Sequence, residues 1–117
     1  MTKAIEDFFA AWAVEDADKR ADMIKGAVAE PVFYADPRTS DPVTSMDALL
    51  AYVGMFSQMA PGMAVAATNI STTLTFARAT VQFGEGERSQ TGQYMVDLDA
   101  DGKITRCVGF IGMGEPS

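Results

Sequence analysis

The sequence predicts an α+β fold in which a curved antiparallel sheet wraps around three N-terminal helices and forms a cone. Two observations predict this class. Apolar residues recur at helical spacing in three segments before Pro61, whereas the rest of the chain is rich in Val, Thr, Phe and Tyr, with turns at Gly84-Glu85-Gly86 and Asp99-Ala100-Asp101-Gly102. Helices first and strands afterwards is the α+β order. We expect the 117 residues to form a single domain, residues 1–117.

Each helix is predicted from an apolar stripe and from a residue that can cap its first turn. The three caps are Thr2, Asp16 and Ser45, because side-chain oxygens of these types accept hydrogen bonds from the free amides of a first turn. The apolar stripe of the first helix consists of Ile5, Phe8, Phe9 and Trp12. The other two stripes consist of Met23, Ile24, Ala27 and Val28, and of Met46, Leu49, Leu50, Val53 and Phe56. Pro31 and Pro61 end the second and third helices.

The segment VFYADPRTSDP, residues 32–42, separates the second helix from the third. Its first three residues, Val32-Phe33-Tyr34, are β-branched and aromatic and predict a short strand, while Asp36-Pro37 begins a loop. From Met63 onward we expect three or four long antiparallel strands. A curved sheet whose open end is closed by helices encloses a natural small-molecule pocket.

The composition excludes several classes of function. The net charge is −7 and no basic cluster occurs, so nucleic acid is not expected as a partner. The chain contains no histidine, which rules out a Ser-His-Asp triad and a His-ligated zinc. The single cysteine, Cys107, lies in an apolar stretch and is expected to be buried and inert. We expect neither a metal nor a cofactor.

No part of the sequence has the character of a membrane or secretory segment. No apolar run approaches the ~20 residues that a spanning helix needs. The first residues, MTKAIEDFFAAW, carry acids where a signal peptide is basic, and no apolar region follows. We therefore expect no membrane partner and a cytoplasmic location.

The order of the predicted elements resembles the nuclear transport factor 2-like (NTF2-like) superfamily, and within it the SnoaL-like group of polyketide cyclases and ketosteroid isomerases. The segments that carry the resemblance are FFAAWAVEDADKRADMI, VFYADP, TSMDALLAYVGMF and TGQYMVDLDADGKITRCVGFIG. The resemblance spans nearly the whole chain. It implies a cone-shaped, cystatin-like α+β barrel, commonly a homodimer packed through the sheet.

The resemblance also implies a catalytic pair. In the ketosteroid isomerase pattern, the acid of the Asp-Pro pair, here Asp36, shuttles a proton at a carbon next to a carbonyl. One donor to the enolate oxygen is a tyrosine on the first helix, where this chain has Phe8, which cannot donate. The second donor position of the pattern holds Tyr94 in this chain, and its hydroxyl can donate a hydrogen bond.

The residues themselves leave the role of this pair open. A carboxylate beside Tyr34 and near Trp12 would be partly desolvated, which makes it a usable base. Asp before Pro is equally a turn former, so Asp36 can be structural. Tyr94 can be a core aromatic residue with a hydrogen-bonded tip.

A pocket is expected around Asp36 and Tyr94. Its predicted wall consists of Trp12, Tyr34, Tyr52, Met55, Phe56, Met59, Phe83 and Phe110. Arg38 and Gln93 are expected as lesser polar contacts. The predicted function is binding of a hydrophobic small molecule, with cofactor-free isomerisation or cyclisation as the catalytic form and Asp36 as its base. A non-catalytic ligand-binding or protein-interaction module with a vestigial pocket is the alternative.

Overall fold

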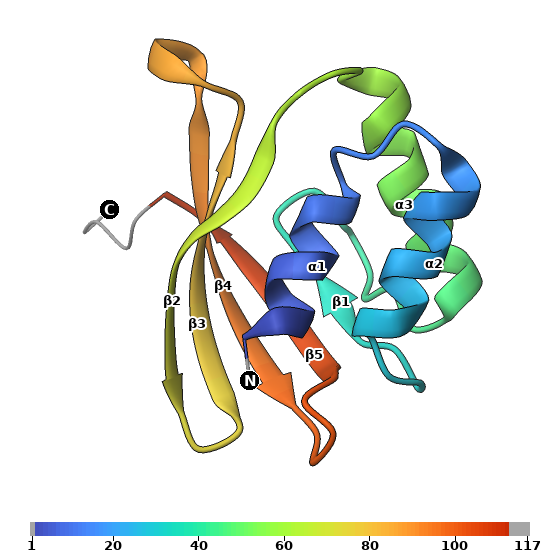
Figure 1. The fold of residues 1–117 in the computed structure, drawn as a ribbon, viewed down its shortest axis with the longest axis vertical. Coiled ribbons are helices and arrows are strands. Elements are labelled where there is room, and N and C mark those ends of the chain that lie inside the picture. Colours follow the sequence, from blue (N-terminus) through green and yellow to red (C-terminus); the bar gives the residue numbers. More distant parts are fainter. Residues whose placement is uncertain (1, 113–117) are drawn as a thin grey trace.

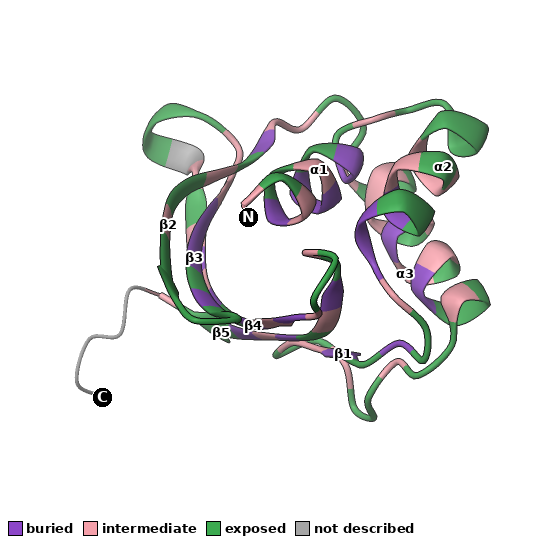
Figure 2. Ribbon diagram, turned by 60° about the horizontal axis from the view of Figure 1, so that its bottom comes forward, coloured by how far each residue is buried: buried purple, intermediate pink, exposed green. Residues whose placement is uncertain are grey.

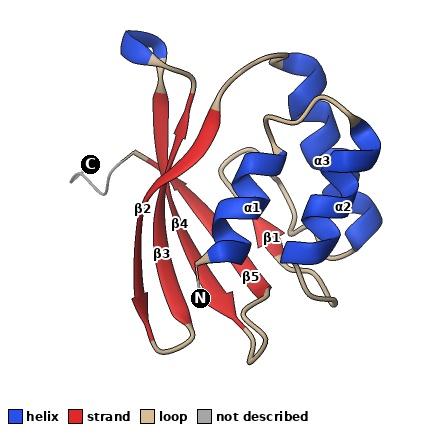
Figure 3. Ribbon diagram, in the orientation of Figure 1, coloured by secondary structure: helices blue, strands red, loops and turns tan. Residues whose placement is uncertain are grey.

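The computed structural model describes residues 2–112, apart from the side chain of Arg88, and it confirms the predicted α+β class. Three helices occupy one side of the molecule and a five-stranded sheet the other (Figure 1). Figure 3 shows the same division by secondary structure. No helix in the described part of the chain is long and apolar enough to cross a membrane.

The helices begin where the sequence predicts. They are α1 (Lys3–Ala11), α2 (Ala17–Ala27) and α3 (Met46–Met59). Asp16 caps α2 and Ser45 caps α3, each by accepting hydrogen bonds from amides of the first turn. Thr2 occupies the capping position of α1, but its side chain makes no capping hydrogen bond.

The sheet is mixed rather than wholly antiparallel. Its strands are β1 (Tyr34–Ala35), β2 (Val65–Thr73), β3 (Phe76–Phe83), β4 (Gln90–Leu98) and β5 (Ile104–Ile111), and a short 3₁₀ helix, η1 (Gly86–Arg88), joins β3 to β4. The spatial order is β1-β5-β4-β3-β2. Strands β2 to β5 are antiparallel neighbours as predicted, whereas β1 pairs in parallel with β5. A two-residue strand carries too little pattern for the sequence to predict its direction.

The long strands curve around α1. Figure 2 shows the sheet as an open curve with α1 on its concave side and with α2 and α3 beyond α1. Register shifts between Ala67 and Asn69 in β2 and between Asp97 and Leu98 in β4 interrupt the regular pairing. Such bulges bend a strand and increase its twist.

The concave face of the sheet forms one wall of the hydrophobic core. On β4, Tyr94, Val96 and Leu98 are buried, while Met95 between them is exposed on the convex face. Cys107 of β5 is also buried, as the sequence predicts, and burial raises the pKa of its thiol. A thiol in this state is a weak nucleophile.

Candidate functional site

Asp36 follows β1 and closes a tight turn with the three residues after it. Its backbone carbonyl accepts from the Thr39 amide at 3.1 Å, and its Oδ1 accepts from the Arg38 amide at 2.8 Å. The Thr39 hydroxyl accepts from the Asp36 amide at 3.1 Å. Asp36 is therefore a turn residue, but the turn uses only one of its two carboxylate oxygens.

The other carboxylate oxygen of Asp36 faces the tyrosines. Oδ2 accepts from the Tyr34 hydroxyl at 2.6 Å and from the Tyr52 hydroxyl at 2.7 Å. Tyr34 lies two residues earlier along the chain and Tyr52 comes from α3. Hydrogen bonds of this length from a hydroxyl to a carboxylate are charge-assisted and fix its orientation.

Three tyrosines, the only ones in the chain, surround this carboxylate. Burial raises the pKa of Tyr34, Tyr52 and Tyr94, and the charge of Asp36 raises each of them further. For Tyr94, a hydrogen bond with Tyr34 acts in the opposite direction on the pKa. All three hydroxyls therefore keep their protons at neutral pH and serve as donors, not as bases.

The position of Tyr94 depends on a glycine in the neighbouring strand. Tyr94 pairs with Gly109 across β4 and β5. A Cβ atom added to Gly109 would lie 2.5 Å from Cε2 of the Tyr94 ring, so the ring lies against bare backbone. The sequence carries a signal for this contact, since a glycine inside a strand often marks a close approach of another group to the backbone.

Two adjoining cavities open near these tyrosines. The first, which we call the Asp36 cavity, has a volume of about 490 Å³, and its wall includes Asp36 and Tyr94. The second, which we call the methionine cavity, has a volume of about 460 Å³, and its wall includes Met55, Met59 and Met63. Both volumes lie in the range of small-molecule sites. Their walls share Trp12, Arg38, Phe83 and Gln90.

The structure brings most of the expected pocket residues to these cavities. Asp36 and Tyr94 line the Asp36 cavity, whereas Tyr52, Met55, Phe56 and Met59 line the methionine cavity. Phe110 borders the Asp36 cavity, but it pairs with Gln93 of β4, so its side chain lies on the same convex face as that of Gln93 and is 53% exposed. Tyr34 is 1% exposed and contributes through its bond to Asp36 rather than as part of the wall. Gln93 alternates with Tyr94 along β4 and points to the opposite face, where its amide donates to the Thr80 hydroxyl at 3.0 Å.

Trp12 lies at the centre of an aromatic cluster. Its ring centroid is 5.1 Å from that of Phe56, 5.9 Å from that of Phe83 and 6.0 Å from that of Tyr52. The side chain is 3% exposed, and its indole N–H finds no acceptor among the described residues. Phe8, one turn earlier in α1, is buried as well and supplies no donor.

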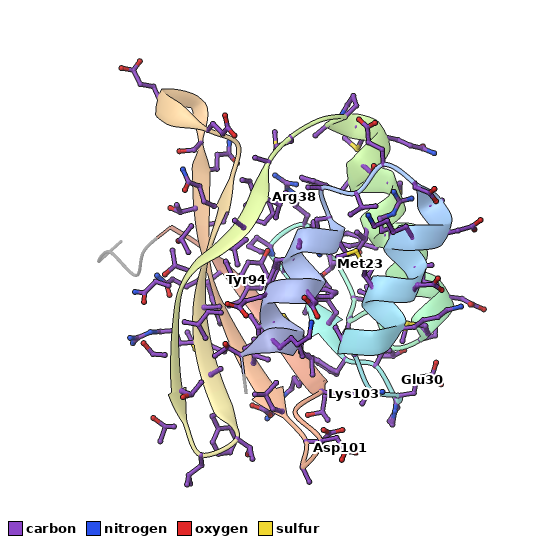
Figure 4. All side chains as sticks on the ribbon, in the orientation of Figure 1. Met23, Glu30, Arg38, Tyr94, Asp101 and Lys103 are labelled. Carbon is purple, nitrogen blue, oxygen red and sulfur yellow. The ribbon has the colours of Figure 1, made fainter. Side chains whose placement is uncertain are left out.

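Arg38 lies at the rim that the two cavities share. Figure 4 labels Arg38 and Tyr94 beside α1. The Arg38 side chain is exposed, and its positive charge acts to lower the pKa of Tyr52 and Tyr94. The guanidinium forms no hydrogen bond or ion pair within residues 2–112.

The described residues contain no group of three or more His, Cys, Asp or Glu side chains arranged to hold a metal ion. The turn before β5 is explained without one. Oδ1 of Asp99 accepts from the amides of Asp101 and Lys103, both at 2.9 Å, and these bonds close the hairpin.

No protein-family model matches the sequence, and no curated protein matches it. Solved structures do match. A SnoaL-like family protein from Agrobacterium tumefaciens is 23% identical with a TM-score of 0.81, over 95% of this chain and 96% of that one. A protein with a ketosteroid isomerase-like fold from Catenulispora acidiphila, in complex with trimethylamine, is 11% identical with a TM-score of 0.75, over 95% and 86% of the two chains.

A de novo designed protein with a curved β-sheet also matches, at 12% identity and a TM-score of 0.71, over 94% of this chain and 83% of that one. The chain therefore has the NTF2-like fold of SnoaL-like and ketosteroid isomerase-like proteins, which confirms the resemblance seen in the sequence. At these identities the likeness establishes the fold alone, because one fold hosts many functions.

Proposed function

We propose that this protein binds a hydrophobic small molecule in the Asp36 cavity. The observation that supports the proposal most strongly is the convergence of Asp36 and Tyr94 on one cavity that Trp12 and Phe83 also line. A few polar groups in an aromatic wall are the usual means by which a pocket orients an apolar ligand. Tyr94 keeps its proton, and the Tyr34 hydroxyl gives its own proton to Asp36. When the Tyr94 hydroxyl turns from Tyr34 to a ligand, the ligand group it suits is therefore an acceptor such as a carbonyl oxygen.

The same pair suits cofactor-free proton transfer next to a carbonyl. Asp36 is the proton acceptor in this scheme, since the tyrosines hold their protons and a guanidinium such as that of Arg38 has no acceptor atom. As Asp36 takes a proton from the carbon, the electron pair of the C–H bond moves toward the carbonyl oxygen, and Tyr94 donates a hydrogen bond to that oxygen. Return of the proton to another carbon completes an isomerisation.

Binding without turnover is the second candidate. Both oxygens of Asp36 already accept hydrogen bonds, two from tyrosines and one from the Arg38 amide. A proton taken up by Asp36 would have to share an oxygen with one of these donors, so part of the acceptor capacity of the carboxylate is already used. In addition, the ketosteroid isomerase pattern has a donor tyrosine on the first helix, where this chain has Phe8, which cannot donate a hydrogen bond.

Exchange of carbon-bound protons separates the two candidates. The probe is 2-tetralone, an apolar ketone, incubated with the protein in D₂O and followed by NMR. Binding with α-proton exchange that Asp36→Asn abolishes supports proton transfer, and binding without exchange supports the second candidate. Asp41→Asn is the matched control, because Asp41 is an exposed acid of the same loop. The binding proposal fails if 2-tetralone does not bind and native mass spectrometry finds no co-purified ligand.

We also propose that the protein is a homodimer that packs through the convex face of the sheet. Phe76 is 54% exposed and Met95 is 41% exposed on that face. Exposed apolar side chains of this size often mark an interface between protein chains. Light scattering at micromolar concentration is expected to give the dimer mass, and a monomer mass there would refute the assembly.

A further inference from the structure

The C-terminal half of α3 leaves large apolar side chains in water beside the methionine cavity. Met55 is 58% exposed and Met59 is 81% exposed, and both line that cavity together with Met63 and Phe56. Exposed apolar surface around a hollow is typical of a ligand-binding groove. Methionine is unbranched and polarizable, so it adapts its shape to a flexible apolar occupant.

Arg38 supplies most of the hydrogen-bond donors in the wall of the methionine cavity. Its guanidinium carries five N–H groups and forms no hydrogen bond or ion pair within the described part of the protein. Gln90 adds an amide with both donors and an acceptor, and the indole N–H of Trp12 is buried. The Tyr52 hydroxyl already donates its proton to Asp36, so it offers no second donor. A wall of this kind favours a ligand that brings an acceptor.

The charges of the two cavities indicate that this acceptor is an anion. Among the described residues that line the methionine cavity, Arg38 is the only one with a charged side chain. In the Asp36 cavity, by contrast, the carboxylate of Asp36 offsets the charge of Arg38. An anionic group is therefore favoured on the methionine side of Arg38 and disfavoured on the Asp36 side.

We propose that the ligand is an elongated apolar carboxylic acid, whose carboxylate pairs with Arg38 and whose apolar chain lies in the methionine cavity. Arg38 suits this role because its planar guanidinium binds a carboxylate through two parallel hydrogen bonds. Since Arg38 lines both cavities, one molecule can also reach the Asp36 cavity. The inference rests on the proposed function, because it assigns a chemical class to the same ligand.

Trp12 is a built-in reporter for the test. It is the only tryptophan in the chain, and it lines both cavities, so its fluorescence reports an occupant. The probes are decanoate, decanamide and decylammonium, which share a chain length and differ in charge. We expect decanoate to bind about tenfold more tightly than decanamide, as a charge-assisted pair allows, and decylammonium to bind most weakly.

Two substitutions, each of which removes one positive charge, test whether the preference for decanoate depends on Arg38. Arg38→Gln is expected to remove the preference for decanoate over decanamide, because glutamine carries no charge for the carboxylate to pair with. Lys19→Gln is the matched control and is expected to keep the preference, because Lys19 is an exposed cation on α2 and lines neither cavity. A third protein carrying both Met55→Ser and Met59→Ser is expected to weaken all three probes alike.

The outcomes distinguish this inference from the proposed function. Equal affinities for decanoate and decanamide in the unmodified protein would overturn the inference, as would a preference that persists in Arg38→Gln. So would the absence of any fluorescence response to the three probes. In each case the binding and exchange of 2-tetralone still decide the proposed function on their own.

Discussion

The two ends of the protein interior contain different kinds of side chain. What we call the aliphatic end consists of Ile5, Ile24, Val96, Leu98 and Ile104, all of them buried. What we call the hydroxyl end consists of Trp12, Tyr34, Asp36, Tyr52 and Tyr94. The aliphatic end has no polar side-chain atom, whereas the hydroxyl end holds a carboxylate and three hydroxyls next to two cavities.

The difference between the two ends indicates which of them contributes most to the stability of the fold. Burial of aliphatic side chains stabilises a fold by roughly 25 cal/mol per Å². A buried hydroxyl or carboxylate contributes little net stability even when it is fully hydrogen-bonded. Folding therefore explains the aliphatic end, whereas the hydroxyl end is where we propose that a ligand binds.

The largest expected effect comes from the aliphatic end. Ile24→Ala removes a fully buried side chain, and large-to-small core substitutions of this kind cost about 2–5 kcal/mol of unfolding free energy. Urea denaturation measures the loss. Below the transition, the affinity for 2-tetralone is expected to stay unchanged, so a variant that keeps its stability but loses the ligand would break the separation of the two ends.

A substitution at Gly109 tests whether the packing of the Tyr94 ring against this glycine positions the hydroxyl end. Gly109→Ala puts a Cβ 2.5 Å from the Tyr94 ring, and we expect the forced shift to cost about 1–3 kcal/mol and to weaken 2-tetralone binding. Gly26→Ala is the matched control, because a Cβ there meets no atom within 4 Å. Inside α2 that change is expected to stabilise the protein by about 0.5–1 kcal/mol.

Substitutions at the two tyrosines that donate to Asp36 are expected to have smaller effects on the free energy of unfolding, and the two effects are expected to differ. Tyr34→Phe removes a buried donor to Asp36 and is expected to cost about 1–2 kcal/mol, whereas Tyr52→Phe removes a donor that is closer to solvent and is expected to cost less. Urea denaturation of both variants in parallel measures the order. The reverse order would mean that Tyr52 is the main support of the carboxylate.

The sequence predicts the parts of the fold that rest on local pattern. The apolar stripes placed Ile24 and Val53 in the core, and Asp16 and Ser45 cap helices as expected. The parallel pairing of β1 with β5 was not predictable in this way, because it joins Tyr34 to Cys107 across most of the chain. Long-range pairing of so short a strand leaves no periodic signal.

The candidate site was predictable as a set of residues and not as a geometry. The sequence singled out Asp36 and posed a choice between a turn residue and an inward-facing acid. The structure shows that Asp36 is both, with Oδ1 in the turn and Oδ2 on two tyrosines. The donation from Tyr52 could not be foreseen, because its place on the apolar stripe of α3 predicts packing and not a bond to a residue sixteen positions earlier.

The raised pKa values of the tyrosines predict how stability depends on pH. For each tyrosine the folded-state pKa lies above the unfolded value of about 10. Their contribution to stability is therefore complete below that pH and is lost as the pH rises beyond it. Burial raises the pKa of the Cys107 thiol as well, from an unfolded value of about 9. Urea midpoints are therefore expected to be flat from neutral pH to about 9, to fall above it as the thiol loses its contribution, and to fall more steeply above about 10.

The most direct test of the hydroxyl end is an alkaline titration followed by the ultraviolet absorbance of tyrosinate. The chain has only three tyrosines and all belong to the site, so the signal reports nothing else. We expect no tyrosinate at pH values near 10 while the protein is folded, and ionisation together with unfolding at higher pH. Asp36→Asn is expected to move the ionisation to lower pH, because the charge of Asp36 raises all three pKa values. Tyrosines that ionise at the ordinary pKa in the folded protein, with no response to Asp36→Asn, would contradict the account.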